Sequence, residues 1–186
     1  MKSVLVSFLF MTGVNLSNGF FPALFQLERS IKCVARNPNP DVHYDKLNEL
    51  CRELDKYEKM GVVKLYKSDM DGNWSIINSR ESRLCFSYQS MDLTNKKASE
   101  VHNYYNGTTI ERKYNIDVHK DFKHITFQKY KEIFNNKNNT IVNGVHGDPF
   151  ENELVYISPV LRVERNSDGE LVVFEPTPVR LNALNL

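Results

Sequence analysis

The chain has 186 residues, of which 41% are hydrophobic and 25% are charged, a balance typical of a folded globular protein rather than a disordered one. Its 24 basic and 23 acidic residues give a net charge of +1, so the chain lacks the basic excess of a general nucleic-acid binder. Its three cysteines are widely spaced and fit neither a disulfide framework nor a zinc ribbon. We therefore expect buried thiols in a reducing compartment, at Cys33, Cys51 and Cys85.

Apolar residues dominate the N-terminal segment from Val4 to Met11. We expect a buried first strand there, because the residues are strand-forming and the run is too short to span a bilayer. The alternative is a cleaved targeting segment, since Lys2 precedes the apolar run and Ser17 and Gly19 suit a cleavage site. The strand interpretation favours a cytoplasmic or virion location over secretion.

Two helices are predicted next. Apolar residues recur at helical spacing from Phe21 to Arg36, and Pro22 suits the first turn. The two Asn-Pro pairs of residues 37–40 must end this helix, because the residue before a proline is forced towards extended backbone. A second helix is predicted from Asp41, as its cap, to Met60. Its apolar stripe consists of Leu47, Leu50, Cys51, Leu54 and Tyr57.

Two β-hairpins are also predicted, one in each half of the chain. The first places residues 62–77 around an Asp71-Gly72 turn. The second turns at residues 166–169, and a four-residue loop there predicts three cross-strand pairs: Arg165 with Glu170, Val163 with Val172, and Leu161 with Phe174.

Between the hairpins the pattern is less regular. Residues 84–91 and 107–116 look extended, whereas residues 127–134 look like a short helix capped by Thr126. The whole order predicts a single α+β domain over residues 1–186, with a largely antiparallel sheet, two helices in the N-terminal half and a C-terminal β-hairpin. Residues 176–186 could form an extended C-terminal arm.

One stretch concentrates residues that can bind metal ions. Two aspartates and two histidines gather within eight residues, at Asp117, His119, Asp121 and His124. On a strand the aspartates and His119 share one face, and on a helix the aspartates and His124 do. His146 and Asp148 would complete a set for a divalent ion. However, two lysines lie inside the cluster, and the alternative is a solvated strand end in which the aspartates form turns and caps.

A second candidate is similar to the metal nucleases that combine a carboxylate with a Glu-x-Lys or Asp-x-Lys triplet. Asp92 and Glu111 would hold Mg²⁺ there, and Lys113 would steady the attacking water. Such triplets also arise by chance, and residues 121–123 form another one.

No catalytic or cofactor-binding motif stands out, so our leading hypothesis is a non-enzymatic structural or adaptor protein of a larger homo-oligomeric assembly. A viral (phage) particle is a natural setting for it, because apolar chain ends could pair with neighbouring subunits. One alternative is a metal-dependent hydrolase or nuclease built on either candidate site. The other is a winged-helix-like nucleic-acid-binding protein formed by the second helix and first hairpin, although acidic residues on that helix would repel phosphate.

Overall fold

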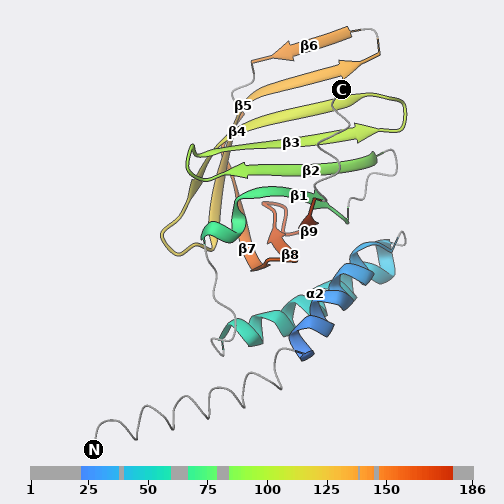
Figure 1. The fold of residues 1–186 in the computed structure, drawn as a ribbon, viewed down its shortest axis with the longest axis vertical. Coiled ribbons are helices and arrows are strands. Elements are labelled where there is room, and N and C mark those ends of the chain that lie inside the picture. Colours follow the sequence, from blue (N-terminus) through green and yellow to red (C-terminus); the bar gives the residue numbers. More distant parts are fainter. Residues whose placement is uncertain are drawn as a thin grey trace, which may run out of the picture.

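The computed structural model describes residues 22–37, 40–59, 67–78, 84–137, 139–144 and 147–177 (Figure 1). The predicted N-terminal strand and residues 178–186 of the predicted arm lie outside these residues.

Both predicted helices are confirmed. One covers residues 22–35, and α2 covers Pro40–Lys59. The start of α2 differs from the prediction, because Pro40 is already helical and Asp41 therefore lies inside the first turn rather than capping it. A proline suits this position, since its fixed φ matches a helix and the missing N–H would have no partner there. A short 3₁₀ helix, η1, follows at Lys67–Met70.

The rest of the described chain is antiparallel sheet. Its strands are β1 (Gly72–Ile76), β2 (Leu84–Asp92), β3 (Lys97–Tyr104), β4 (Thr109–Val118), β5 (His124–Asn136), β6 (Asn139–Asn143), β7 (Phe150–Ser158), β8 (Leu161–Arg165) and β9 (Leu171–Pro176). The hydrogen-bonded order is β4-β3-β2-β1-β9-β8-β7-β5-β6, and β4 also pairs with β5. Eight strands therefore close into a barrel, with β6 added outside the ring.

Strand β5 changes its partner along its length, and the barrel opens where it does so. On one edge it pairs with β4 along most of its length. On the other edge, residues 124–127 pair with β7 and residues 132–136 pair with β6. The barrel is thus closed at the 124–127 end, and beyond it β6 continues the sheet in place of β7 (Figure 1).

The described residues form two hydrophobic cores, one on each face of β7, β8 and β9. The outer core joins both helices to these strands, through residues such as Ile31, Leu54 and Val163. The inner core fills the barrel and includes Trp74 and Phe127. Strand β7 contributes to both cores, and its β-bulge between Leu154 and Tyr156 places two consecutive residues, Val155 and Tyr156, in the outer core. Full burial of one large apolar side chain contributes about 1.5–3 kcal/mol, so the two cores together account for the main stabilising term.

The antiparallel α+β prediction is confirmed, and the closed barrel is more specific than the prediction. The helix predicted at residues 127–134 is wrong, because these residues belong to β5. Their apolar side chains recur near helical spacing, but Phe127 pairs with Phe150 of β7 and Phe134 pairs with Ile110 of β4. Pairing along both edges of the strand outweighs the weak local preference for helix.

The first predicted hairpin is also wrong. Residues 61–66 lie outside the described residues, but residues 67–70 form η1 and β1 has no free edge. Trp74 pairs with Gln89 of β2 on one side and with Pro176 of β9 on the other. The wing required by the winged-helix alternative therefore cannot be formed by β1.

The second hairpin is confirmed, but its register differs by one residue from the prediction. Val163 pairs with Val173 instead of Val172, and Arg165 pairs with Leu171. The loop consists of three residues, 167–169, because the N–H of Asn166 donates to the carbonyl of Glu170. This shift turns Val172 and Phe174 into the barrel, and it places Val173 on the outer core.

Two of the three thiols are not buried as expected. Cys51 lies in the outer core, whereas Cys33 and Cys85 are exposed. Among the described residues, no helix has the length and apolar character needed to cross a membrane.

Candidate functional site

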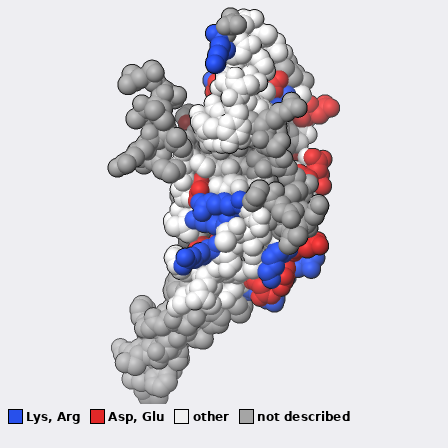
Figure 2. Space-filling view, turned by 90° about the vertical axis from the view of Figure 1, so that its right-hand side faces the viewer, with Lys and Arg blue, Asp and Glu red and all other residues white. Residues whose placement is uncertain are grey.

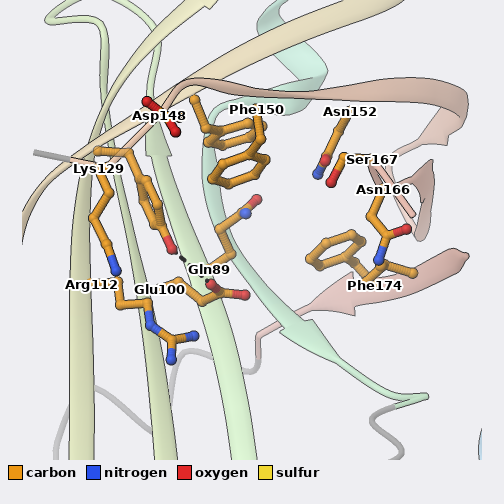
Figure 3. Close-up of a pocket in the computed structure, with 14 residues that line it drawn as sticks. Gln89, Glu100, Arg112, Lys129, Asp148, Phe150, Asn152, Asn166, Ser167 and Phe174 are labelled. Carbon is orange, nitrogen blue, oxygen red and sulfur yellow. Dashed lines mark hydrogen bonds between the residues drawn. The ribbon is translucent and has the colours of Figure 1, made fainter. Parts of the chain in front are cut away.

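The barrel contains a cavity at the end where β7 separates from β5. Residues 128–131 of β5 lie between its β7 and β6 pairings, and here the N–H of Gly147 donates to the Lys129 carbonyl (3.4 Å). The cavity has a volume of about 460 Å³. Its lining comes from β2, β3, β4, β5, β7 and β9, from residues 147–148 and from the β8–β9 turn (Figure 3).

Aromatic rings form one wall of the cavity. Phe127 and Phe150 are directly paired across β5 and β7, and their rings stack with centroids 5.3 Å apart and planes 9° apart. Tyr114 meets both rings edge-on, at centroid distances of 5.7 and 5.8 Å. Each such contact contributes about 0.5–1.5 kcal/mol beyond simple burial. The wall therefore consists of three aromatic rings in mutual contact.

Charged side chains lie on the side formed by β3, β4 and β5 (Figure 3). Arg112 Nε donates to Glu132 Oε1 at 2.8 Å, and Lys129 Nζ lies 3.8 Å from the same oxygen. Tyr114 Oη donates to Glu100 Oε2 at 3.2 Å, and His102 Nε2 lies 3.5 Å from that oxygen. Register explains the grouping, because Glu100 pairs with Arg112 and Arg112 pairs with Glu132 across three neighbouring strands.

These contacts move three pKa values away from neutral pH. Burial raises the pKa of Tyr114, and the Glu100 carboxylate raises it further. Burial alone would raise the pKa of Glu100, but His102, Arg112 and the Tyr114 hydroxyl outweigh it and hold that pKa below its usual value. The bond from Arg112 lowers the pKa of Glu132. At neutral pH the tyrosine stays protonated and the carboxylates stay ionised, whereas general acid–base catalysis favours a pKa near the working pH.

A buried ion pair lies behind the cavity. Arg162 and Glu164 are neighbouring interior positions of β8, and both side chains are fully buried, with Nε 3.4 Å from Oε1. Burial lowers the pKa of Arg162, while Glu164 and Glu100 oppose that effect. The guanidinium also contacts four uncharged side chains, those of Gln89, Met91, Trp74 and Phe174. Gln89 and Phe174 are cavity residues, so the ion pair supports the lining from behind.

Asn152 connects this ion pair to the cavity. Its Nδ2 donates to Glu164 Oε2 at 2.9 Å, whereas its Oδ1 has no hydrogen-bond partner within the described part of the chain. Asn152 is 7% exposed and lines the cavity. Buried acceptors without a partner are uncommon and destabilising, so a donor that reached this oxygen would be stabilised there.

The predicted Asp117–His124 cluster lies at the β4–β5 turn. Asp121 Oδ2 is 2.7 Å from His124 Nδ1, and Asp121 Oδ1 accepts from the N–H groups of Lys123 and His124. The bond to Asp121 raises the pKa of His124. His119 Nε2 lies 2.9 Å from Thr126 Oγ1 and 3.3 Å from Glu151 Oε2.

The structure therefore brings Asp121 and His124 together with His119 nearby, at a ring distance of 5.8 Å. Asp117 is directed to Lys96 Nζ, 2.9 Å away. Asp148 instead lines the cavity, and His146 lies outside the described residues. Within the described ranges, no three His, Cys, Asp or Glu side chains are arranged to hold a metal ion.

The predicted nuclease residues are divided between two strands. Asp92 accepts hydrogen bonds from Asn95 in the β2–β3 turn, at 2.9 and 2.6 Å. Glu111 and Lys113 pair with each other at 3.2 Å on β4, on the face opposite to Arg112. Strand β3 lies between β2 and β4, so a whole strand separates Asp92 from the Glu111–Lys113 pair.

Helix α2 carries opposite charges that pair with each other, including Lys46 with Glu49 at 2.7 Å. Acidic and basic side chains are likewise interspersed on the face in Figure 2. Both observations are typical of an ordinary solvated surface. The phosphates of a nucleic acid would meet carboxylates there as well as ammonium groups.

The sequence did not reveal the residues of the cavity or of the ion pair behind it. Arg162 and Glu164 alternate with the apolar Leu161 and Val163, which is the usual pattern of a half-exposed strand. Both sets are buried here, and only the pairing of β8 inside a closed ring explains that. Glu100 and Arg112 likewise lie on strands rich in polar residues. The sequence signal available there was the alternation of side chains between the two faces of a strand, which places every second residue on the same face.

Comparison of the chain with protein-family models, with curated proteins and with solved structures gave no match.

Proposed function

We propose that this protein is a non-enzymatic binding protein that holds a small, partly apolar organic molecule inside its barrel. The observation that carries the proposal is the cavity of about 460 Å³, with an aromatic wall on one side and charged and amide side chains around the rest of it. Small-molecule sites in proteins mostly have volumes of about 300–1,000 Å³, and aromatic side chains are common in their lining. Barrels of about eight strands can hold one small ligand.

The chemistry of the lining supports binding rather than catalysis. The described lining residues include no histidine or cysteine. The tyrosine and the nearby carboxylates keep their ordinary charge at neutral pH, for the reasons given above. The cations are paired with carboxylates, so they orient a ligand without being free to take part in proton transfer.

Filling the cavity tests this proposal. Val172 lines the cavity from β9, and Val172→Trp would occupy much of the space. Val160 lies in the β7–β8 turn and is exposed, so Val160→Trp adds the same indole outside the barrel as a matched control. N-phenyl-1-naphthylamine, which fluoresces in apolar surroundings, serves as the probe.

We expect the wild type and Val160→Trp to bind one probe molecule each, and Val172→Trp to bind at least about tenfold more weakly. Thermal unfolding verifies that both variants fold. A wild type that does not bind the probe, or a folded Val172→Trp that binds it as well as the wild type does, would rule out the cavity as a binding site.

A second candidate function continues the sequence-based hypothesis of a homo-oligomeric structural protein, and strand β6 favours it. Among the described residues this strand pairs only with β5, and all five of its own residues are exposed and uncharged. Natural edge strands are usually protected by charges, prolines or bulges. Antiparallel pairing of two β6 strands about Ile141 would place Asn139 opposite Asn143, giving a self-complementary twofold interface.

Light scattering on Ile141→Lys tests this assembly. Two lysines would face each other at the twofold axis, so we expect the wild type to self-associate and the variant to be monomeric. Val160→Lys, on another exposed surface, is the control and should behave as the wild type does. A wild type that stays monomeric at all concentrations would refute the β6 interface.

A further inference from the structure

The orientation of the Asn152 amide is determined by its neighbours. Its Nδ2 donates to Glu164 Oε2, and a carboxylate can only accept hydrogen bonds. Rotating the amide by half a turn would place two acceptor oxygens against each other. Arg162 Nε lies 3.4 Å from the other oxygen of this carboxylate, Oε1, so the guanidinium and the Asn152 amide face the two oxygens of Glu164. Asn152 therefore directs its NH₂ group towards Glu164, and its carbonyl oxygen is the atom that accepts no hydrogen bond.

We propose that the ligand of the cavity carries a hydrogen-bond donor, a hydroxyl or an N–H on a flat aromatic body, and that this donor binds Asn152 Oδ1. The inference rests on the proposed binding function and specifies its ligand class. A ligand that lacks a donor leaves the buried oxygen unpaired, whereas a donor satisfies it.

The spacing of the lining agrees with a small flat ligand. Asn152 and Phe150 are two residues apart on β7, so they are about 7 Å apart along the strand and point to the same face. A ring that packs on the wall of Phe127 and Phe150 thus places a substituent near Asn152. Phe174 lies on the Asn152 side of the cavity, opposite the charged group (Figure 3).

The charges of the lining disfavour an anionic ligand. Two carboxylates, Glu100 and Asp148, and two cations, Arg112 and Lys129, line the cavity, so their formal charges cancel. Glu132 already accepts from Arg112 at 2.8 Å and lies 3.8 Å from Lys129. A ligand carboxylate would have to displace Glu132 and would also meet Glu100.

Matched probes test the ligand class on the full chain. 2-Naphthol is a neutral donor at pH 7.5, 2-methoxynaphthalene has the same ring without a donor, and 2-naphthoate is an anion. Each probe competes with N-phenyl-1-naphthylamine. We expect 2-naphthol to bind about tenfold more tightly than either other compound, which corresponds to one unpaired buried acceptor.

Two variants assign this preference to a residue. Asn152→Leu should bind 2-naphthol and 2-methoxynaphthalene about equally. Asn73→Leu, the same change at an exposed position of β1 outside the cavity, should keep the wild-type ratio. If Asn152→Leu does not fold, the wild-type ratio decides the question alone.

The outcomes separate the inference from the proposed function. If N-phenyl-1-naphthylamine does not bind, the proposed function fails and the inference fails with it. If it binds but 2-methoxynaphthalene or 2-naphthoate competes as well as 2-naphthol does, only the inference is overturned. A folded Asn152→Leu that keeps the tenfold preference would overturn the assignment to Asn152.

Discussion

Arg162 and Glu164 place two opposite charges inside the barrel with no exposed side-chain surface. Removing water from both groups costs several kcal/mol each, and their mutual attraction offsets that cost only while both are present. Arg162 also packs on aromatic rings, with its Cζ 3.9 Å from the centroid of Phe174 and 5.1 Å from that of Trp74. The ion pair therefore adds little net stability, and its main effect is to hold the neighbouring interior side chains in one arrangement.

This reasoning predicts an asymmetry between single and double substitutions. Arg162→Met leaves Glu164 as an uncompensated buried charge, and we expect the free energy of unfolding to fall by about 3–5 kcal/mol. Arg162→Met combined with Glu164→Gln removes both charges while keeping an acceptor for Asn152, so it should regain at least half of that loss. Urea denaturation at pH 7 measures both values. Equal losses in the single and double variants would contradict the ion-pair argument.

At the scale of elements, the β8–β9 turn determines which side chains enter the barrel. The N–H of Gly169 donates to the Asn166 carbonyl, and Asn166 Oδ1 accepts from the N–H groups of Asp168 and Glu170. Gly169 has a φ of +80°, a left-handed conformation that suits the last residue of a three-residue loop. A four-residue loop would reverse the facing of β9 and put Phe174 outside.

Substitution of Gly169 should cost only conformational energy, because an added Cβ would meet nothing within 4 Å. We expect Gly169→Ala to lower the free energy of unfolding by about 1–2 kcal/mol, and Gly169→Asn by less, since asparagine tolerates this region better. Gly144→Ala is the matched control, because that site is equally open and its φ is not positive. Chemical denaturation distinguishes them, and equal values for Gly169→Ala and Gly144→Ala would refute the turn argument.

The elements also differ in how well the sequence predicted them. Both helices follow an apolar stripe over many residues, which is local information, and their positions were predicted to within a few residues. Strand β5 was predicted as helix, because Phe127, Tyr130 and Phe134 recur at three- and four-residue spacing. On the strand, Phe127 instead enters the barrel and Tyr130 contacts Lys97, whose Nζ is 4.7 Å from the ring centroid. The partners that decide between these structures are not neighbours in sequence.

At the scale of the whole molecule, ring closure is the property that the sequence does not encode locally. Trp74 pairs with Pro176 across about a hundred residues, and the β5–β7 and β4–β5 pairings complete the ring. Closure gives β7, β8 and β9 two buried faces, because the helices cover the outside of the barrel. The usual alternation of buried and exposed residues then disappears, and so the polar interior positions Glu100, Asn152 and Arg162 could not be recognised as a site.

Three buried groups with raised pKa values make the stability of the whole molecule sensitive to alkaline pH. Burial raises the pKa of Cys51 from about 9 to about 12. Burial also raises the pKa of Tyr114, with the Glu100 carboxylate adding to it. It raises the pKa of Tyr156 as well, whose hydroxyl donates to Glu28 Oε1 at 2.6 Å. All three groups are protonated in the folded protein at pH values where the unfolded chain has lost these protons.

The sign of the effect follows from proton counting. Below pH 9 both states keep these protons, and stability does not depend on them. Above pH 9 the unfolded state first loses the Cys51 proton, and above about pH 10 it loses the two tyrosine protons, so stability falls by up to about 1.4 kcal/mol per pH unit per group. Urea unfolding between pH 8 and 11 should show this decline.

The Tyr156→Phe variant has no hydroxyl to ionise at this position. Above pH 10 its free energy of unfolding should therefore fall less steeply than that of the wild type, by the contribution of one titrating group. Its stability at pH 8 should be lower than that of the wild type, because Glu28 loses a hydrogen-bond partner. Equal slopes for Tyr156→Phe and the wild type would mean that the Tyr156 hydroxyl ionises as readily in the folded protein as in the unfolded chain, and would contradict its buried bond to Glu28.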